Sequence, residues 1–392
     1  MSDDFVFSNA DHEYMRRALA LAERGLYTTL PNPAVGCVLV KNGKIIGEGW
    51  HHRAGEPHAE VMALRNAAER NQNVKGAAAY VTLEPCSHYG RTPPCALGLV
   101  NAGIVRVVAA MKDPNPLVSG RGLKMLADAG VCVSWGLYEQ EARELNRAFL
   151  YSIVNSMPYV TVKYGMSLDA RVALANGESK WITSEASRRD VQRMRARHQA
   201  VLTSAATVAR DDPSLNVRWP ELPEAVRELF SEDPGITPLR IIVDPDNAVT
   251  LKEKLFQCPG KVLIVRTGDG DAVTEERISD SVSVAKVPAR EDNPRHISFR
   301  HLWRYLDIIS IRSVMIEAGR GLVSDVIRQN AANEIVVYVA PKIMGGDAVS
   351  AFGALGLNSM KEVPELVISD VAAIGSDVRI TCRFKEGACL PE

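Results

Sequence analysis

The sequence lacks any strong imbalance of charge and any long apolar run. Its 46 Lys and Arg residues nearly match its 47 Asp and Glu residues, which gives a formal net charge of -1. Such a balance gives no electrostatic reason to expect nucleic acid or an anionic membrane as a partner, so a small-molecule substrate is favoured. No stretch approaches the roughly 20 apolar residues that a membrane-spanning helix needs, and we expect no transmembrane segment.

Cysteine is scarce, and a signal-peptide pattern is missing. The chain has 7 cysteines in 392 residues, an odd number without the dense spacing of a disulfide framework. Its first residues, MSDDFVFSNADHEYMRR, are acidic and do not form a basic start followed by an apolar segment. We therefore expect a cytoplasmic protein with reduced thiols.

The patterns that are present indicate two α/β domains. A length of 392 residues exceeds what one hydrophobic core usually organises. The first part contains a hairpin signal at Asn42-Gly43 and helical spacing over 58–71, and strand-like and helix-like segments then alternate. This alternation favours a sheet covered by helices, and it restarts after a proline-containing segment. We predict domains at residues 1–154 and 155–392.

One group of residues in the first domain has the chemistry of a catalytic zinc site. His58 and Glu60 open a predicted helix, Cys86 follows a predicted strand, and Cys95 starts the next helix. Catalytic zinc takes three protein ligands from His and Cys and leaves its fourth position for water, while a nearby carboxylate moves protons. The sequence therefore predicts His58, Cys86 and Cys95 as ligands and Glu60 as the proton carrier.

Simpler explanations compete with the zinc site. A His at the start of a helix is often a surface residue, and a lone Cys usually acts as a small hydrophobic residue. A structural zinc site would need four ligands, and His88 is near enough in sequence to be the fourth. That alternative leaves Glu60 without a role.

The spacing of the two cysteines departs from the usual deaminase pattern. Base deaminases carry H-x-E followed by P-C-x-x-C. Here the segment SHYGRTPP separates Cys86 from Cys95 and carries His88 and Arg91 toward the metal. This insertion weakens a cytidine or tRNA assignment and indicates a different, phosphorylated substrate.

The segments PNPAVGCVLV, HAE and EPCSHYGRTPPC together make the chain resemble the bifunctional deaminase/reductase family of riboflavin biosynthesis. In the second half, KYGMSLDARVALANGESKWITS, ARDDPSLNVR, AGRGL and APKIMGG are similar to that family's reductase domain. The resemblance implies a cytidine-deaminase-like α/β/α domain followed by a dihydrofolate-reductase-like α/β domain, with Zn²⁺ and NADPH as cofactors. It also implies two consecutive steps on a pyrimidinone ribosylamine 5′-phosphate, namely deamination of the ring and reduction of the ribosyl group to ribityl.

The resemblance further implies a set of binding residues. The deaminase residues near the pyrimidine, sugar or phosphate are Asn32, His51, His88 and Arg91. The residues implied to contact NADPH are Gly165, Trp181, Thr207, Asp211, Gly319, Arg320, Gly321, Leu322, Val323, Ser324 and Asp325. Those implied to contact the reductase substrate are Ser179, Arg195, Leu215, Arg218 and Glu317. Ordinary roles stay open for some of them: a turn for Asn32, an exposed position for His51, and solvated charges for Arg195 and Arg218.

The residues of the second half also carry an argument of their own. No G-x-G-x-x-G follows its first strand, which disfavours a Rossmann domain. The Gly319-Arg320-Gly321 segment lies between a predicted strand and helix, where amides can bind a phosphate, although it could equally be a plain turn. Lys163 lies inside an apolar strand and should face a polar cavity, so we expect it to hold or protonate the opened sugar together with Asp211.

Two departures from the reductase pattern concern glycine. The chain reads TSAATVARDDP where related reductases have a glycine-containing VGxGTV, and SLDARV where glycine commonly follows the aspartate. Side chains at these positions put the cofactor affinity and the choice between NADPH and NADH in question.

Two other functions compete with the bifunctional enzyme. In one, the deaminase is active and the C-terminal domain is a degenerate binding or oligomerisation module. In the other, the first domain edits bases in nucleic acid, but the near-neutral charge and the SHYGRTPP segment argue against it. We expect the protein to form a homo-oligomer, either a dimer or a tetramer.

Overall fold

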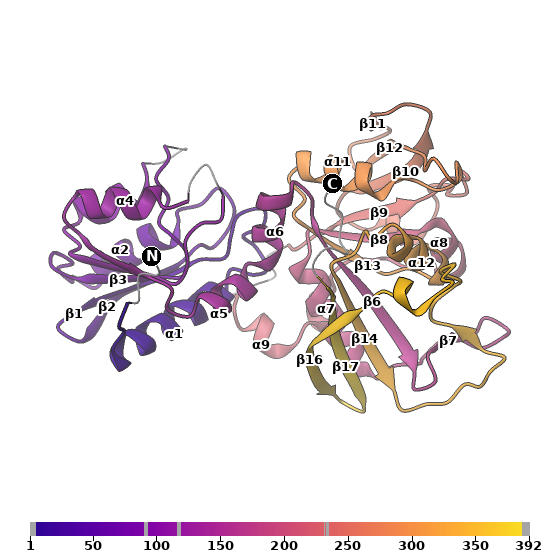
Figure 1. The fold of residues 1–392 in the computed structure, drawn as a ribbon, viewed down its shortest axis with the longest axis horizontal. Helices are drawn as coiled ribbons and strands as arrows, with labels where there is room; N and C mark the ends of the chain where they lie inside the picture. The colour runs from indigo at the N-terminus through magenta and orange to yellow at the C-terminus, as the bar shows by residue number, and fades with distance from the viewer. Residues whose placement is uncertain (1–4, 90–92, 116–118, 231, 233–234, 386–392) are drawn as a thin grey trace. The chain divides into compact units, whose positions relative to one another are not determined.

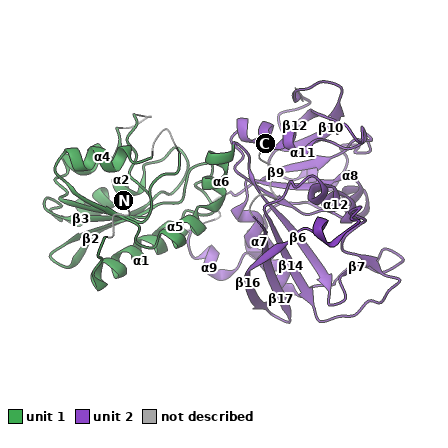
Figure 2. Cartoon of the chain, viewed as in Figure 1, with its two compact units in different colours: residues 1–155 green, residues 156–392 purple. Residues whose placement is uncertain are grey.

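The computed structural model describes residues 5–89, 93–115, 119–230, 232 and 235–385 of the chain. The chain divides into two compact units, residues 1–155 and residues 156–392 (Figure 2). Each unit has its own sheet with covering helices (Figure 1). No helix in the described part of the chain is long and apolar enough to cross a membrane.

The first unit is built on a five-stranded sheet of order β2-β1-β3-β4-β5. Its strands are β1 (Gly36–Lys41), β2 (Lys44–Trp50), β3 (Ala78–Val81), β4 (Arg106–Ala109) and β5 (Cys132–Trp135). β1 pairs antiparallel with β2 and β3, and β3, β4 and β5 run parallel. The predicted hairpin is present, and Asn42 and Gly43 have φ values of 51° and 72°, as a tight hairpin turn requires.

Helices cover both faces of this sheet. They are α1 (Asn9–Glu23), α2 (Ala59–Glu69), α3 (Cys95–Asn101), α4 (Arg121–Asp128), α5 (Glu139–Leu145) and α6 (Arg147–Asn155). Alternate residues of β1 enter opposite layers: Leu39 packs with α2, α3 and α4, whereas Val38 packs with α1, α5 and α6. The unit is therefore an α/β/α sandwich.

The sequence pattern predicts one helix over 138–154, but the structure has two, α5 and α6. The regular helix ends at Leu145 and resumes at Arg147, because Asn146 between them has φ -105° and ψ 18°, and its side chain is buried. Its Oδ1 accepts from the Ala34 amide at 2.8 Å and its Nδ2 donates to the Ala34 carbonyl at 2.8 Å. This contact over a long sequence separation explains the difference.

The second unit is built on a ten-stranded sheet of order β11-β12-β10-β9-β8-β13-β6-β14-β17-β16. The strands are β6 (Tyr159–Ser167), β8 (Ala200–Ser204), β9 (Leu239–Val243), β10 (Val262–Gly268), β11 (Thr274–Arg277), β12 (Val282–Pro288), β13 (Ser313–Ile316), β14 (Glu334–Ala340), β16 (Leu366–Ile374) and β17 (Asp377–Phe384). The strands from β12 to β14 in this order run parallel, and β11, β17 and β16 pair antiparallel at the two edges. A separate pair joins β7 (Arg171–Ala173) to β15 (Val349–Ser350).

The helices of the second unit are α7 (Glu185–Arg197), α8 (Ala205–Asp211), α9 (Glu224–Arg227), α10 (Lys254–Gln257), α11 (Phe299–Ile308) and α12 (Arg320–Arg328), with 3-10 turns at Trp219–Glu221 and Met360–Glu362. The chain moves outward from β6 through β8, β9 and β10, and then returns to β13 and β14. Right-handed crossovers therefore put α7, α8 and α10 on one face and α11 and α12 on the other. The direction of the crossovers therefore changes between the neighbouring strands β8 and β13. Open parallel sheets bind ligands at such a point, beyond the carboxyl ends of the strands.

Candidate active sites

Three predicted metal ligands meet in the first unit. His58 precedes α2, Cys86 lies in the loop between β3 and α3, and Cys95 is the first residue of α3. His58 Nδ1 lies 3.7 Å from Cys86 Sγ and 3.3 Å from Cys95 Sγ, and the three ligand atoms lie within 4.8 Å of one another. Ligands at zinc's bond lengths in a tetrahedron are separated by about 3.6 Å, so this donor set fits Zn²⁺.

The protein environment prepares a thiolate at this site. The Cys95 thiol and the His58 ring, with the Cys95 backbone amide at 3.3 Å, lower the pKa of Cys86 to about 4. The Cys86 thiolate and burial raise the pKa of Cys95 in turn. Since the thiolate is the form that binds metal, Cys86 is ready for a cation at neutral pH.

Glu60 lies in the first turn of α2, two residues beyond His58, and only 4% of its surface is exposed. Burial, assisted by the Cys86 thiolate, raises the pKa of Glu60 to about 7. A carboxyl group with such a pKa can both accept and donate a proton near neutral pH. The position and the acidity of Glu60 therefore suit the proton carrier that the sequence predicts.

Two other predicted residues of this unit lie together beside the metal ligands. Asn32 Nδ2 is 3.1 Å from His51 Nε2, and the His51 ring lies 5.3 Å from the His58 ring. His51 itself is buried. His88 lies on an exposed part of the loop after β3, and Arg91 lies outside the described residues. The predicted roles of these four residues stay predictions.

In the second unit, three predicted residues form one ionic cluster, with side chains that are 11–21% exposed. Glu317 follows β13, Lys163 lies in β6, and Arg195 lies in the last turn of α7. Arg195 donates two hydrogen bonds, of 2.5 and 3.1 Å, to the Glu317 carboxylate. Lys163 Nζ lies 3.6 Å from the same carboxylate. Burial would raise the pKa of Glu317, but the Arg195 and Lys163 charges outweigh it and hold that pKa at about 2. Burial also lowers the pKa of Lys163.

The segment after α8 is tied to this cluster. Arg195 Nη1 donates to the Asn216 carbonyl at 3.2 Å. The neighbouring Leu215 is buried and has a positive φ of 50°, an uncommon conformation for a residue with a side chain. Arg218 pairs with Glu221 at 2.9 Å and keeps half of its side chain exposed, while Ser179 is half-buried in the loop before α7. Arg218 is thus available for a phosphate that reaches this segment.

The helices after β8 and β13 begin side by side. The Gly319 amide donates to Thr207 Oγ1 at 3.3 Å, which joins the residue before α12 to the first turn of α8. An added Cβ at Gly321 would meet no atom within 4 Å, so the first turn of α12 is open to a close ligand. Free amides at a helix start are suited to bind phosphate groups, and this juncture fits the pyrophosphate of a dinucleotide.

Three other predicted cofactor residues, Gly165, Trp181 and Asp211, lie in different settings. Gly165 lies in β6, where an added Cβ would come 3.2 Å from Thr183 Cγ2. Trp181 is 64% exposed, with the Arg188 guanidinium 4.4 Å from its ring centroid. Asp211 ends α8 and pairs with the adjacent Arg210 at 3.2 Å. The structure thus gives Asp211 a partner other than Lys163.

Comparison with known proteins decides the family. Residues 8–111 match the cytidine and deoxycytidylate deaminase zinc-binding region, and residues 158–380 match the RibD C-terminal domain. The chain is 46% identical to the riboflavin biosynthesis protein RibD of Escherichia coli over 94% of this chain and 98% of that protein. It is 44% identical to the Haemophilus influenzae RibD over 96% of this chain and 98% of that protein.

Solved structures agree over nearly the whole length. Acinetobacter baumannii RibD superposes with a TM-score of 0.83 at 40% identity, covering 96% of this chain and 99% of that chain. A Thermotoga maritima diaminohydroxyphosphoribosylaminopyrimidine deaminase/5-amino-6-(5-phosphoribosylamino)uracil reductase has a TM-score of 0.80 at 31% identity, with coverages of 96% and 99%. The chain belongs to the RibD family.

As a RibD family member, the chain is a bifunctional riboflavin-biosynthesis enzyme, with a deaminase and a reductase. Its cofactors are Zn²⁺ and NADPH. The predicted fold, a cytidine-deaminase-like domain followed by a dihydrofolate-reductase-like domain, is confirmed. The family relationship supports the bifunctional enzyme over the two competing functions, a degenerate C-terminal domain and a nucleic-acid base editor.

The two departures from the RibD glycine pattern have different structural consequences. Ala170, in SLDARV, has a positive φ of 58°, a conformation that glycine adopts at lower cost. Ala205 and Ala206 instead lie in the first turn of α8, where helical backbone accepts alanine readily. Only the first departure therefore strains the backbone.

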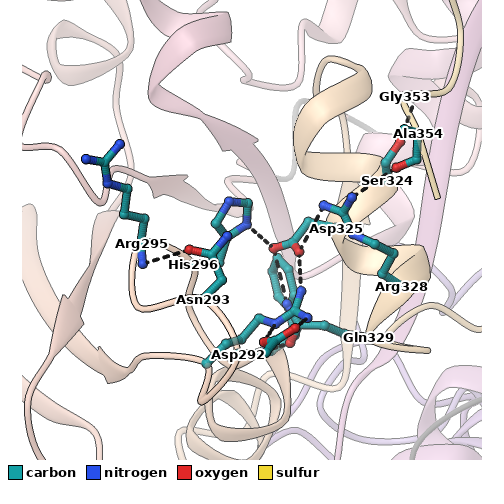
Figure 3. A network of polar contacts seen from close by, with 12 residues as sticks. Asp292, Asn293, Arg295, His296, Ser324, Asp325, Arg328, Gln329, Gly353 and Ala354 are labelled. Carbon is teal, nitrogen blue, oxygen red and sulfur yellow. Dashed lines mark hydrogen bonds and ion pairs between the residues drawn. The ribbon is translucent and has the colours of Figure 1, made fainter. Parts of the chain in front are cut away.

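The last three residues predicted to contact the cofactor, Val323 to Asp325, point their side chains into the protein interior. The side chains of Val323, Ser324 and Asp325 are buried, and Ser324 Oγ accepts from the Gly353 amide at 2.8 Å. Asp325 binds Arg290 at 2.7 Å and His296 at 2.9 Å. Figure 3 shows the His296 ring next to the Asp325 carboxylate. The open amides belong to the preceding residues, Arg320, Gly321 and Leu322. Sequence reasoning missed the Asp325 network because its partners on the loop before α11 have no motif.

Proposed function

We propose that residues 1–154 remove the ring amino group of 2,5-diamino-6-ribosylamino-4(3H)-pyrimidinone 5′-phosphate by hydrolysis. We further propose that residues 155–392 reduce the ribosyl group of 5-amino-6-(5-phosphoribosylamino)uracil to ribityl with NADPH. The observation that carries the deaminase is the buried Glu60 beside three zinc ligands. The reductase rests on the ionic cluster at Glu317 beside the juncture of α8 and α12. Both substrates agree with the activities named for the Thermotoga maritima relative.

In the deaminase, Glu60 moves the protons. Bound Zn²⁺ supplies Lewis acidity that makes water acidic near neutral pH. Glu60 accepts a proton from the attacking water and returns it to the departing amino group, which leaves as ammonia. Its pKa of about 7 permits both transfers.

In the reductase, Lys163 acts on the opened sugar as a hydrogen-bond or proton donor. NADPH supplies the hydride, and conversion of the opened ribosyl group to ribityl also requires a proton. Lys163 holds or protonates the sugar, because its ammonium group lies 3.6 Å from the Glu317 carboxylate and its side chain is 21% exposed. Glu317 keeps Arg195 and Lys163 oriented, and Arg195 and Arg218 provide guanidinium groups for the substrate phosphate. Asp211 assists from the end of α8.

We also propose that the enzyme is a cytoplasmic homo-oligomer, a dimer or a tetramer. β16 is the last strand of the large sheet, and one of its edges lacks a partner strand among the described residues. Its apolar side chains are unusually exposed, with Val367 at 51%, Ile368 at 63% and Val371 at 59%. Exposed apolar edge strands commonly form interfaces, which supports assembly through this strand.

The experiment that tests the two activities follows ammonia release and NADPH oxidation separately. The variant is Glu60→Gln, and the control is Glu69→Gln, which removes an exposed carboxylate from the same helix. We expect Glu60→Gln to release ammonia about 10²-fold to 10⁴-fold more slowly, while it still oxidises NADPH when supplied with the deaminated intermediate. Metal-loaded wild type that releases no ammonia from the proposed substrate would refute the substrate assignment. Ammonia release without any NADPH oxidation would refute the second step.

A further inference from the structure

A row of charged residues lies at the carboxyl ends of β9, β10 and β12. Val243 of β9 is in register with Val265 of β10, so Asp244 and Arg266 follow at the same level. Arg266 is in register with Lys286 of β12. Register neighbours point to the same side of a sheet, so Arg266 and Lys286 form a basic pair on one face.

This face is the one that α8 covers. Ile264 and Val284, each two residues before a member of the pair, pack in one core cluster with Ala205 and Val208 of α8. Since side chains alternate along a strand, Arg266 and Lys286 share that face. The basic pair therefore lies on the same side of the sheet as the helix whose first turn contacts Gly319.

The pair is also close to the dinucleotide juncture. Ser204 of β8 is in register with Val243 of β9, and β10 is the next strand (Figure 1). Two strand spacings separate β8 from β10, roughly 10 Å. A cofactor whose pyrophosphate lies at the first turns of α8 and α12 would extend its adenosine half over the end of β9 toward this pair.

The neighbouring acid, Asp244, forms only a long ion pair with Arg266. Asp244 is buried, and its two oxygens accept from the amides of Ala248 at 2.8 Å and Val249 at 3.2 Å. Arg266 Nη2 lies 3.8 Å from Asp244 Oδ2, which is beyond hydrogen-bond distance. Asp244 is thus committed to the loop after β9 and is not available to a ribose hydroxyl, the role that a carboxylate has in many NAD sites.

Arg266 itself has unused hydrogen-bonding capacity. Its Nε is buried and has no hydrogen-bond partner among the described residues. Its side chain is 31% exposed, so the guanidinium group can reach a ligand at the surface. Lys286, beside it, is exposed. A planar guanidinium with free donors next to an ammonium group suits a phosphate monoester, which carries close to two negative charges.

We propose that Arg266, assisted by Lys286, binds the 2′-phosphate of NADPH and sets the enzyme's preference for NADPH over NADH. The proposal rests on the reductase assignment and on no assumption about the pyrimidine substrate. It makes these two residues specificity determinants, far from the reacting carbon.

The test is binding to the full-length protein, measured by titration calorimetry with 2′,5′-ADP and with 5′-AMP. These probes differ only in the 2′-phosphate. For Arg266→Gln we expect affinity for 2′,5′-ADP to fall roughly tenfold to a hundredfold, the range for lost hydrogen bonds to a charged group, with affinity for 5′-AMP unchanged. The kcat/KM for NADPH should fall by a similar factor, while that for NADH should not.

Two further variants keep this test decisive. Arg277→Gln removes an exposed arginine of β11 that pairs with Asp280, so it controls for general loss of positive charge. Lys286→Gln tests the second member of the pair and, since that side chain is exposed, should leave folding intact. Equal losses for both probes, or a loss in Arg277→Gln as large as in Arg266→Gln, would overturn the proposal. Unchanged 2′,5′-ADP affinity in both Arg266→Gln and Lys286→Gln would overturn it as well.

Discussion

His51 holds the amide of Asn32 through a ring nitrogen whose protonation is fixed by the backbone. The other ring nitrogen, Nδ1, lies 3.1 Å from the carbonyl oxygen of Pro57, which can only accept a hydrogen bond. Nδ1 therefore carries the proton, and Nε2 accepts from Asn32 Nδ2 at 3.1 Å. This relay orients the Asn32 amide so that Oδ1 can accept a hydrogen bond, as the predicted contact with the pyrimidine requires.

Replacement of His51 by Phe should therefore weaken the deaminase. The ring volume stays, but Asn32 loses the acceptor that orients its amide, so we expect the deaminase kcat/KM to fall about tenfold. Zinc content and the reductase rate of the same protein serve as internal controls. Unchanged ammonia release with full zinc content would contradict the orienting role.

The reductase should depend on the charge of Lys163. We expect Lys163→Met to lower the reductase kcat by about 10²-fold to 10⁴-fold, because the variant keeps an unbranched side chain one atom shorter but cannot donate a proton. Lys252→Met, which removes an exposed ammonium group from the same unit, is the control. Single-turnover oxidation of NADPH with the deaminated intermediate measures the step directly. A Lys163→Met rate equal to that of the control would remove Lys163 from the mechanism.

The same lysine predicts a pH dependence for reduction. Burial lowers the pKa of Lys163 below its ordinary 10.5. If the ammonium form is the active one, the rate is full at low pH and falls as pH rises through that lowered pKa. We expect the alkaline limb of the kcat profile to lie below pH 10.5 in the wild type and to be absent from the residual activity of Lys163→Met. A limb that persists in the variant would assign the titration to another group.

Ala170 carries a backbone cost that glycine would relieve. A left-handed conformation costs a residue with a Cβ about 1–2 kcal/mol, and the added chain entropy of glycine offsets about half of it. We expect Ala170→Gly to raise the free energy of unfolding of the second unit by about 0.5–1 kcal/mol. Gly177→Ala is the reverse control, since Gly177 has a φ of 88° and no atom lies within 4 Å of its added Cβ. Urea unfolding of both variants checks the two signs, and stabilisation by both changes would contradict the explanation.

The sequence predicts those parts of the molecule whose determinants are close together in the chain. The hairpin at Asn42 and Gly43 depends on two adjacent residues, and the fold around it follows from local periodicity. The break at Asn146 could not be predicted, because it depends on a contact with Ala34 that forms only after folding. In the reductase, the resemblance names Glu317 and Arg195, and the position of Lys163 inside an apolar strand singles out that lysine. Their common ion cluster joins positions more than a hundred residues apart, which only the sheet order brings together.

The buried carboxylate of Asp11 predicts how the first unit responds to acid. Asp11 Oδ1 accepts from Tyr80 at 2.6 Å and from Arg106 at 2.7 Å, and Oδ2 accepts from the Ser8 amide at 2.8 Å. Burial opposes the charge, but these hydrogen bonds outweigh it and lower the pKa of Asp11 below its ordinary 3.8. A lowered folded-state pKa stabilises the protein above the unfolded pKa, and that stabilisation is lost as pH falls from about 4 toward the folded value.

Replacement of Asp11 by Asn should therefore remove both the stabilisation and its pH dependence. At pH 7 we expect the free energy of unfolding of the first unit to fall by about 2 kcal/mol, because Arg106 and Tyr80 lose a charged acceptor. Asp128→Asn, which breaks an exposed pair with Lys124, should change it by less than about 0.5 kcal/mol. Chemical unfolding between pH 3 and pH 7 measures both effects. The difference between wild type and Asp11→Asn must shrink as the pH falls below 4, and a difference that stays constant would show that the charge of Asp11 does not stabilise the fold.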